Sequence, residues 1–300
     1  MENLPVDYFL ALHAFTKVTH RDIYPEIDPA SPSNSQAGKV IVITGASKGL
    51  GRLAFATSFA KANPKGIVLA ARSAIALVEV VQEIHAINSE IEVLAIPTDI
   101  LKQEDITALW RMVKERFGHA DVLVNNAGAF SSQGPLGQVE PGAWWTDFEI
   151  NARGSFLMTR GFLALLNHSQ KGTIINLTTG AATEIVPSLS SYSLSKLIAL
   201  QMQGFIAAEN PNVTAVALHP GMVMTDMSIK AGLERFALDT PSMVGGVAVW
   251  LCAGKAPWLS GRYLCANWCV EELKGREREV VEGGKLRMGL VGDFGAQQFK

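Results

Sequence analysis

Six short runs in the chain are apolar at nearly every position, with no regular alternation of polar and apolar residues. They cover residues 39–44, 66–71, 91–97, 121–128, 172–178 and 212–220. A strand with one face in water alternates, whereas a strand covered on both faces is apolar throughout. The runs therefore predict buried strands of a parallel sheet.

Segments with helical periodicity lie between these runs, as at 73–88, 102–117, 147–166 and 190–209. Strands that alternate with helices form βαβ units, whose crossovers are right-handed. The pattern predicts an α/β fold: a single doubly wound domain with a parallel sheet of about seven strands and helices on both faces.

The two ends of the chain extend beyond this pattern. The start, "MENLPVDYFLALHAF", is apolar but has no basic n-region or small-residue cleavage site, so we expect no secretory signal. An amphipathic surface helix, docked on the body or on a partner, is expected instead. Residues 25–38 are rich in Pro, Ser and Asn and predict a linker or surface arm. We divide the chain into an arm (1–37), a catalytic domain (38–275) and a C-terminal extension (276–300).

Composition narrows the function. Hydrophobic residues make up 48% of the chain and the net charge is −2, with no basic stripe, so we expect a sizeable core and no nucleic-acid partner. No run of eighteen apolar residues is present, so no membrane span is expected. The cysteines at 252, 265 and 269 form no CxxC pair. They indicate a reducing, cytoplasmic location, and no histidine beside "CANWC" completes a metal site.

The first strand is followed by "TGASKGLG", residues 44–51. Gly45 permits a tight turn, Gly49 lets the backbone approach a pyrophosphate, and Gly51 allows close packing of helix on strand. The helix that follows offers free N–H groups and the positive end of its dipole to phosphates. A turn of this kind can be merely structural, but between a first strand and a helix it favours nucleotide binding.

The spacing G-x-x-x-G-x-G resembles that of the short-chain dehydrogenase/reductase family. Four further stretches agree in order: "NNAG" at 125–128, Asn151 in "INARGSF", "YSLSK" at 192–196 and "PGMVMT" at 220–225. The resemblance covers residues 38 to about 270. It implies a Rossmann-type domain, a nicotinamide cofactor, a small-molecule carbonyl or alcohol substrate, and a homodimer or homotetramer. The terminal extensions resemble those of family members from fungal specialised metabolism.

The end of the second strand indicates which cofactor is bound. An acidic residue there favours NAD, whereas an arginine accommodates the 2′-phosphate of NADP. This strand ends "LAARS", with Arg72 and no acidic residue, and Lys48 lies in the glycine turn. We expect NADP(H), although both cations could be solvated surface charges. The resemblance further implies that Asp99 contacts the adenine and Thr225 the nicotinamide amide. It places the remaining cofactor contacts at Ser47, Leu50, Asn126, Ala127, Gly128, Pro220, Gly221 and Val223, beside Tyr192 and Lys196.

Tyr192 and Lys196 lie four residues apart, which puts them on one face of a helix. A phenol has a pKa near 10, and a neighbouring ammonium favours the phenolate and lowers this pKa. The pair predicts that Tyr192 donates a proton to a carbonyl, or accepts one in the reverse direction. A surface tyrosine and lysine are the alternative.

The family's serine, thirteen residues before the tyrosine, is replaced here by Thr179. Its hydroxyl can donate the same hydrogen bond, but its methyl crowds the site. Thr179 either polarises the substrate carbonyl as the serine would, or indicates that carbonyl polarisation has weakened and the reaction differs from that of the family. Asn151 either holds a water that links Lys196 to solvent or satisfies a kink in its helix.

Two functions remain open. The first is NADPH-dependent reduction of a bulky, mostly apolar carbonyl compound, or the reverse oxidation. Its substrate would lie against residues 221–243, with Phe130, Trp144 and Trp145 as wall, core or interface residues. The second is a non-redox protein on the same fold, either a redox-neutral catalyst or a cofactor-binding sensor. Thr179 and the terminal extensions favour this second reading.

Overall fold

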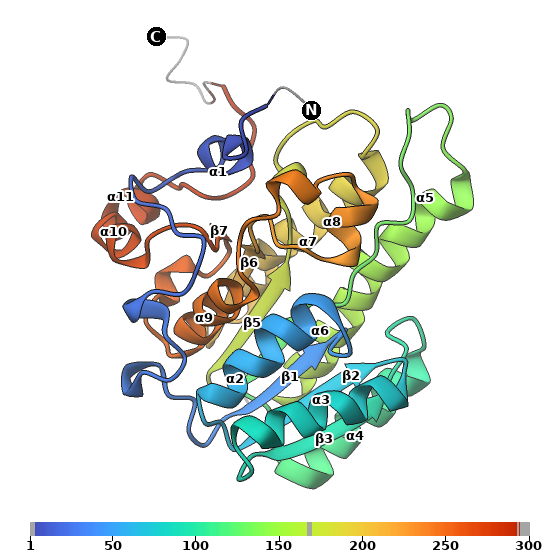
Figure 1. The fold of residues 1–300 in the computed structure, drawn as a ribbon, viewed down its shortest axis with the longest axis vertical. Helices are drawn as coiled ribbons and strands as arrows, with labels where there is room; N and C mark the ends of the chain where they lie inside the picture. The colour runs from blue at the N-terminus through green and yellow to red at the C-terminus, as the bar shows by residue number, and fades with distance from the viewer. Residues whose placement is uncertain (1–3, 167–169, 293, 295–300) are drawn as a thin grey trace.

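A single parallel sheet organises the chain. The structure is a computed structural model that describes residues 4–166, 170–292 and 294. The strands run in the order β3-β2-β1-β4-β5-β6-β7, all parallel (Figure 1). They are β1 (Val40–Thr44), β2 (Gly66–Ala71), β3 (Glu92–Pro97), β4 (Val122–Asn125), β5 (Gly172–Leu177), β6 (Val213–His219) and β7 (Arg262–Cys265). The predicted fold class is confirmed, and each of the six apolar runs contains a strand.

Helices connect the strands. They are α1 (Tyr8–Leu12), α2 (Thr57–Lys61), α3 (Ala74–Ile87), α4 (Gln103–Phe117), α5 (Pro141–Phe148), α6 (Ser155–Leu165), α7 (Ser190–Glu209), α8 (Asp226–Lys230), α9 (Pro241–Cys252), α10 (Val270–Gly275) and α11 (Glu277–Glu282). A π-helical turn, Gly51–Ala56, precedes α2, and another, Glu149–Gly154, joins α5 to α6. The predicted helix 147–166 is therefore continuous in path but has a wider turn around Asn151.

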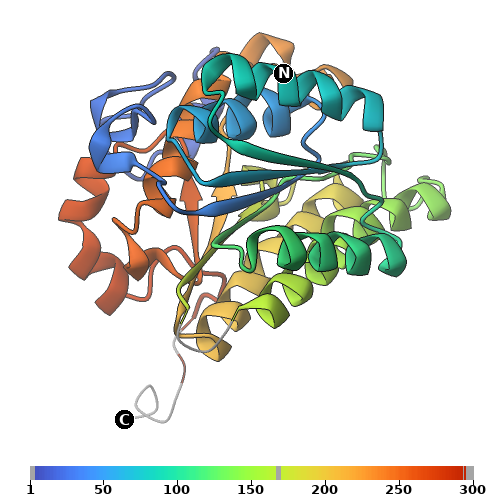
Figure 2. The ribbon, with the colours of Figure 1, turned by 90° about the horizontal axis from the view of Figure 1, so that it is seen from below.

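Both faces of the sheet are covered (Figure 2). One apolar cluster packs α2, α3, α9 and α10 on the first face, and the other packs α4, α6 and the end of α7 on the second. Strands β1 and β4 both lie at the centre of the sheet, yet their helices leave toward opposite faces. Ligands of such folds bind at the carboxyl ends of the strands near this reversal.

The N-terminal residues pack against the body more closely than their composition predicts. Ile27 is fully buried in the first apolar cluster, and Asn34 and Gln36 are buried as well. The Gln36 side chain donates a hydrogen bond to the Val249 carbonyl at 3.1 Å. The expectation of a surface arm or linker at 25–38 is thus wrong for Ile27, Asn34 and Gln36. The polar composition of this segment gave no sign that neighbouring residues exclude water from these side chains.

The beginning and end of the described chain lie beside one another on the β7 side of the sheet. Segment 13–20 runs along residues 267–269, where His20 N donates to the Asn267 carbonyl at 2.8 Å. The backbone of Leu286 accepts a hydrogen bond from Tyr263 N in β7. Among the residues that the structure describes, no helix has the length and apolar character needed to cross a bilayer.

Candidate active site

The glycine turn after β1 is shaped by close backbone contacts. Gly45 has a φ of +64°, and a Cβ there would lie 2.8 Å from Ala127 Cα. A Cβ on Gly51 would lie 2.1 Å from the Gly45 carbonyl oxygen, so both positions exclude a side chain. Gly49, with a φ of +53°, has no atom of the described residues within 4 Å of its Cβ position. Its open side leaves room for a ligand to approach the backbone, which fits the pyrophosphate of a dinucleotide.

The "NNAG" stretch is bound to this turn. Asn126 Nδ2 donates to the carbonyls of Thr44 (2.8 Å) and Gly45 (3.1 Å). The Thr44 hydroxyl accepts hydrogen bonds from the backbone N–H groups of Asn126 and Ala127, each at 3.0 Å. Asn126 therefore joins the carboxyl ends of β1 and β4 at the edge where a nucleotide would lie.

The charged residues expected near a 2′-phosphate are at the surface. Lys48 forms an ion pair of 2.7 Å with Asp226 at the start of α8, and both side chains are exposed. Arg72 is exposed directly after β2, and Ser73 beside it caps α3 by accepting a hydrogen bond from Ala76 N. The two cations are thus accessible to a ligand on the glycine turn.

Two other expected cofactor residues, Asp99 and Thr225, already make local hydrogen bonds. Asp99 Oδ1 accepts from Leu101 N at 3.1 Å, within the turn that leads into α4. The Thr225 hydroxyl caps α8 by accepting from Ser228 N, and Ser228 Oγ accepts a hydrogen bond from Thr225 N. Ser47 and Leu50 are half-buried in the glycine turn.

The segment after β6 turns sharply at Gly221, which follows Pro220. Gly221 has a φ of +77°, and a Cβ would lie 2.4 Å from Asp239 Oδ2 and 2.5 Å from Asn267 Oδ1. Val223 is buried and pairs with Asp239 in an isolated bridge. The return of the chain at Asp239 thus fixes the start of the proposed substrate segment.

Tyr192 lies in the first turn of α7, next to the carboxyl end of β5. Its hydroxyl is hydrogen-bonded to the side chain of Thr179. Its ring is half-buried and meets Phe130 edge-on, with ring centroids 5.4 Å apart. The structure therefore brings together Tyr192 and the threonine that replaces the family serine.

The pKa of Tyr192 differs from our expectation. Burial raises it to about 12, and the negative charge of Asp147 acts in the same direction; the hydrogen bond with Thr179 acts against both. The predicted lowering of this pKa by Lys196 is wrong for the protein without cofactor, because desolvation of the phenolate outweighs any stabilisation of the phenolate by the ammonium. Tyr192 is a protonated acid at neutral pH.

Lys196 is buried one turn further along α7. Its ammonium donates to the Leu177 carbonyl at 2.9 Å, and burial lowers its pKa to about 8, against the opposing charge of Asp147. A Cβ on Gly128 would lie 3.2 Å from Lys196 Nζ and 3.1 Å from Asn151 Oδ1. Gly128, Asn151 and Lys196 therefore converge at the end of β4.

Asn151, fully enclosed within the π-helical turn, ties three segments together. Its carboxamide accepts from Ala129 N (2.8 Å) and donates to the Ala129 carbonyl (2.9 Å). It also donates to the Ser195 hydroxyl at 2.9 Å. These bonds hold the loop after β4 against α7.

Thr179 occupies the position expected of the serine. Its Oγ1 accepts a hydrogen bond from Ala181 N at 3.3 Å, which leaves the hydroxyl proton available to another acceptor. The neighbouring Thr178 is buried, and its hydroxyl donates to the Lys196 carbonyl. Of the two threonines, Thr179 is thus the one hydrogen-bonded to Tyr192.

The sequence reasoning missed Asp147. This carboxylate is fully buried, and it accepts hydrogen bonds from Ser191 Oγ (2.5 Å) and Ser131 N (2.7 Å). It therefore joins the loop after β4 to the residue just before Tyr192. The available signal was an acidic residue directly flanked by Thr146 and Phe148 in the aromatic stretch "GAWWTDFEI", four residues before Asn151.

The aromatic residues of α5 form a cluster of their own. Trp144, Trp145 and Phe148 are in mutual ring contact, with centroids 4.6–5.2 Å apart. Trp145 is 59% exposed, so it lies at the surface and not in the core.

The segment 221–243, expected beside the substrate, holds methionines in different surroundings. Met243 is fully buried in the core, whereas Met222 lines a cavity described below.

The fold and this convergence of residues at the carboxyl edge define a dinucleotide-binding oxidoreductase. The family model for short chain dehydrogenases matches residues 39–235, and the chain belongs to that family. Its cofactor is accordingly a nicotinamide dinucleotide, and the open glycine turn fits one.

Curated relatives and solved structures agree with this assignment. The short chain dehydrogenase mpl6 of Monascus purpureus is 36% identical over 280 residues, which cover 91% of this chain and 95% of that protein. The short chain dehydrogenase andI of Emericella variicolor is 33% identical over 283 residues, covering 92% and 96%. A short chain dehydrogenase structure from Salmonella enterica serovar Typhi has a TM-score of 0.71 at 22% identity, covering 81% of this chain and 99% of that one. The oxidoreductase yciK from E. coli has a TM-score of 0.72 at 22% identity, covering 79% and 98%. At this identity the two structures support the fold alone.

Proposed function

We propose that the protein is an NADPH-dependent reductase that converts a ketone or aldehyde on a bulky, mostly apolar small molecule into an alcohol. The observation that carries this proposal is the hydrogen bond between the Tyr192 phenol and the Thr179 side chain, with Lys196 one turn further along α7. Two hydroxyl groups that meet at the carboxyl edge of the sheet can both bind one carbonyl oxygen.

Each residue has a distinct part in this chemistry. A reduced nicotinamide supplies the hydride when it is bound. Thr179 donates a hydrogen bond that polarises the substrate carbonyl, and Tyr192 transfers its proton to the carbonyl oxygen. Lys196 places a positive charge near the phenolate left on Tyr192. Asn151 and Asp147 fix the loop after β4 against the first turns of α7 through their hydrogen bonds.

The protonation state of Tyr192 supports the direction of the reaction. Reduction needs a protonated phenol, and a pKa of about 12 keeps the phenol protonated at neutral pH. Oxidation of an alcohol needs the phenolate, which is scarce under the same conditions. The Tyr192 phenol is therefore available as the proton donor for reduction at neutral pH.

The preference for NADPH is supported by Arg72 and Lys48. Both side chains are exposed beside the glycine turn, and β2 ends without an acidic residue. A guanidinium binds phosphate through a planar fork of N–H groups, so Arg72 suits the 2′-phosphate. The proposal also includes a cytoplasmic location and, given the relatives in Monascus and Emericella, a role in specialised metabolism.

We further infer a homodimer or homotetramer. Helices α6 and α7 expose apolar side chains, and the exposed fractions are 49% for Phe156, 44% for Leu194, 43% for Ile198 and 62% for Phe205. Large exposed apolar patches mark interaction surfaces. Sedimentation at micromolar concentration, with Phe205→Glu as the disrupting variant, tests this inference.

The Tyr192→Phe variant tests the proposed function. We expect turnover of NADPH with aryl and alicyclic ketones to fall by about 10²- to 10⁴-fold, the usual contribution of a general acid, while the dissociation constant for NADPH stays the same. Tyr24→Phe is the matched control, because it makes the same change at a hydroxyl that bonds the Trp268 carbonyl and Val270 N away from the cleft. If Tyr192→Phe keeps full turnover, the proposed role of Tyr192 is wrong. If the wild type binds NADPH but consumes none with any carbonyl compound, the non-redox alternative takes its place.

A further inference from the structure

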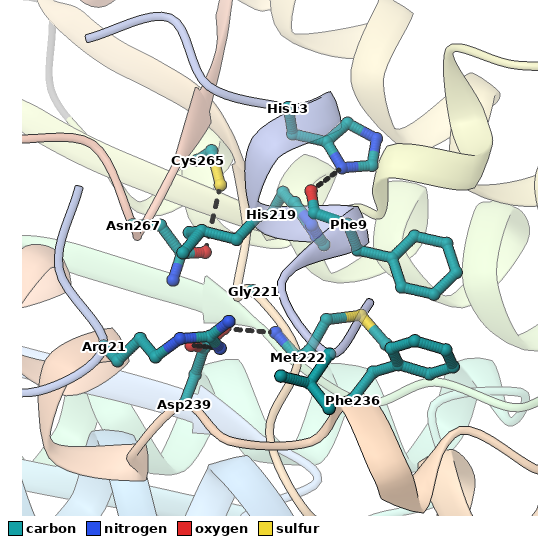
Figure 3. A pocket seen from close by; sticks show the side chains of 12 residues that line it. Phe9, His13, Arg21, His219, Gly221, Met222, Phe236, Asp239, Cys265 and Asn267 are labelled. Atoms are coloured by element: carbon teal, nitrogen blue, oxygen red, sulfur yellow. Dashed lines mark hydrogen bonds and ion pairs between the residues drawn. The ribbon is translucent and has the colours of Figure 1, made fainter. Parts of the chain in front are cut away.

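A small cavity lies between α1 and the segment after β6 (Figure 3). Residues far apart in sequence line it, among them Phe9, His13, His219, Met222, Phe236 and Asn267. Its volume is only about 10 Å³, close to the least that holds one oxygen atom with its hydrogens. The N-terminal arm, which contributes no strand to the sheet, forms one side of this cavity.

The cavity adjoins the carbonyl-binding groups of the proposed reaction. The His13 ring packs against Gly180, the residue after Thr179, so closely that a Cβ there would lie 2.3 Å from His13 Nε2. On the other side, Gly221 lines the cavity directly after Pro220. A substrate bound at Thr179 and Tyr192 would therefore have the arm as its neighbour on the β6 side.

The cavity combines an apolar wall with an unsatisfied polar group. Phe9 of the arm meets Phe236 edge-on, with ring centroids 5.0 Å apart, and Met222 lies beside them. His219 is 5% exposed, and its Nδ1 has no hydrogen-bond partner among the described residues. A buried polar atom without a partner costs free energy, which a ligand atom can recover.

The charges in the cavity lining are already paired, which indicates an uncharged ligand: Arg21 and Asp239, which both line it, form an ion pair of 2.8 Å. Burial lowers the pKa of His219 to about 3, so its imidazole is neutral and offers one N–H and one lone pair. His13 Nε2 lies 3.3 Å from a carboxylate oxygen of Glu184. A nearby carboxylate repels an anion, while a neutral imidazole can bond a hydroxyl or carbonyl oxygen.

The arm is held firmly enough to act as a wall. The His13 carbonyl accepts a hydrogen bond from Trp268 Nε1 at 2.7 Å. Asn267 Nδ2 donates to the His20 carbonyl at 2.9 Å, and Arg21 forms an ion pair of 2.8 Å with the buried Asp239. These bonds fix the residues that follow α1 against the ends of β6 and β7.

We propose that the N-terminal arm completes the substrate site and that this cavity binds a second, uncharged oxygen of the substrate, a hydroxyl or carbonyl on a ring system remote from the reacting carbonyl. Phe9 contacts the ring system, and His219 bonds the oxygen, with His13 as its neighbour. These three residues determine specificity. The inference deepens the proposed reductase function and rests on it.

The test compares two probe ketones, 2-acetylnaphthalene and 6-hydroxy-2-acetylnaphthalene, by calorimetric titration into the full chain with NADP⁺ present. We expect the wild type to bind the hydroxylated ketone about tenfold more tightly, the value of one hydrogen bond to a buried group. His219→Phe should remove this preference and leave the binding of the plain ketone unchanged. Phe9→Ala should weaken both ketones alike, whereas Leu12→Ala, on the exposed side of α1, should weaken neither.

Several results would overturn the inference: failure of both ketones to bind, equal binding of both to the wild type, or a preference that survives in His219→Phe. If His219→Phe does not fold, His13→Phe takes its place, since the imidazole at 13 packs edge-on against His219 at 5.4 Å. The expected binding pattern without NADPH oxidation would refute the proposed function instead and leave the oxygen-binding cavity standing.

Discussion

The carboxylate of Asp147 accepts a 2.5 Å hydrogen bond from Ser191, the residue that immediately precedes Tyr192. The same carboxylate accepts from Ser131 N, so a buried negative charge lies between the loop after β4 and the start of α7. This charge raises the pKa of Tyr192, and that of Lys196 too. After burial, Asp147 is thus the second cause of the raised pKa of Tyr192.

Asp147→Asn tests this relationship. Asparagine keeps an oxygen for Ser131 N and can donate to the Ser191 hydroxyl, so the fold should persist while the charge is lost. The pKa of Tyr192 should fall toward its ordinary value, because the charge of Asp147 is the second cause of its rise after burial. The pH profile of alcohol oxidation, which requires the phenolate, should then move to lower pH by the same amount. Glu149→Gln, two residues further on and exposed, should leave the profile in place; an unmoved profile in Asp147→Asn would refute the electrostatic role.

The roles of the Thr179 hydroxyl and of its methyl group can be tested separately. Thr179→Val keeps the shape and removes the hydroxyl, and kcat for ketone reduction should fall by about 10²- to 10³-fold, as for loss of one oxyanion donor. Thr179→Ser keeps the hydroxyl and should retain most of kcat, with KM values that change with the bulk of the substrate. Steady-state kinetics on both variants check this; equal activity of Thr179→Val and wild type would show that the hydroxyl does not polarise the carbonyl.

The buried ammonium of Lys196 should destabilise the folded protein at neutral pH. Its pKa in the folded protein is about 8, below the ordinary value of 10.5, so the unfolded chain binds more protons between these two pH values. Stability from this group therefore rises with pH across that window and is lowest below pH 8. The stability of Lys196→Met relative to wild type should fall by roughly 2–4 kcal/mol between pH 7.5 and 10.5, since one pKa unit is worth about 1.4 kcal/mol. Urea unfolding of both proteins at the two pH values measures this, and a difference independent of pH would contradict it. The variant should also lose ketone reduction.

The ion pair between Lys48 and Asp226 should compete with a 2′-phosphate. Asp226→Asn frees the Lys48 ammonium, and the affinity for NADPH should increase up to about fivefold, the value of an exposed ion pair. Arg72→Ser should weaken NADPH binding by about tenfold or more and leave NADH binding unchanged, because a charge-assisted hydrogen bond is worth about 1.5–3 kcal/mol. Fluorescence titration with both cofactors measures the constants. Equal losses for NADPH and NADH in Arg72→Ser would place Arg72 away from the 2′ position.

The sheet could be predicted from the sequence because buried strands are apolar at every position, and each of the six runs contains one. The strand Arg262–Cys265 was not located, because "RYLC" is short and begins with a charged residue. In the structure, Arg262 Nη1 donates hydrogen bonds to the carbonyls of Trp258 and Ser260. The motif residues after β1, β4, β5 and β6 do meet at one edge, because parallel strands bring their carboxyl ends together.

Long-range contacts account for what could not be predicted. Asp147 is buried against Ser131 and Ser191, and His13 packs against Gly180 and His219. Neither set of contacts leaves a periodic signal in the sequence. The raised pKa of Tyr192 also depends on burial and on Asp147, whereas local spacing indicated only Lys196. Asn151, within the wide helical turn, likewise bonds Ala129 and Ser195, which lie far from it in the sequence.

The central claim, that the glycine turn and Arg72 bind NADPH for ketone reduction, is tested most directly by thermal unfolding of the purified protein with NADPH, with NADH and with neither. A ligand at 100 times its dissociation constant stabilises the folded state by about 2.7 kcal/mol, which raises the midpoint measurably. The account predicts a clear rise with NADPH and a much smaller one with NADH at the same concentration. A larger rise with NADH would contradict the role of Arg72, and no rise with either cofactor would contradict the reductase itself.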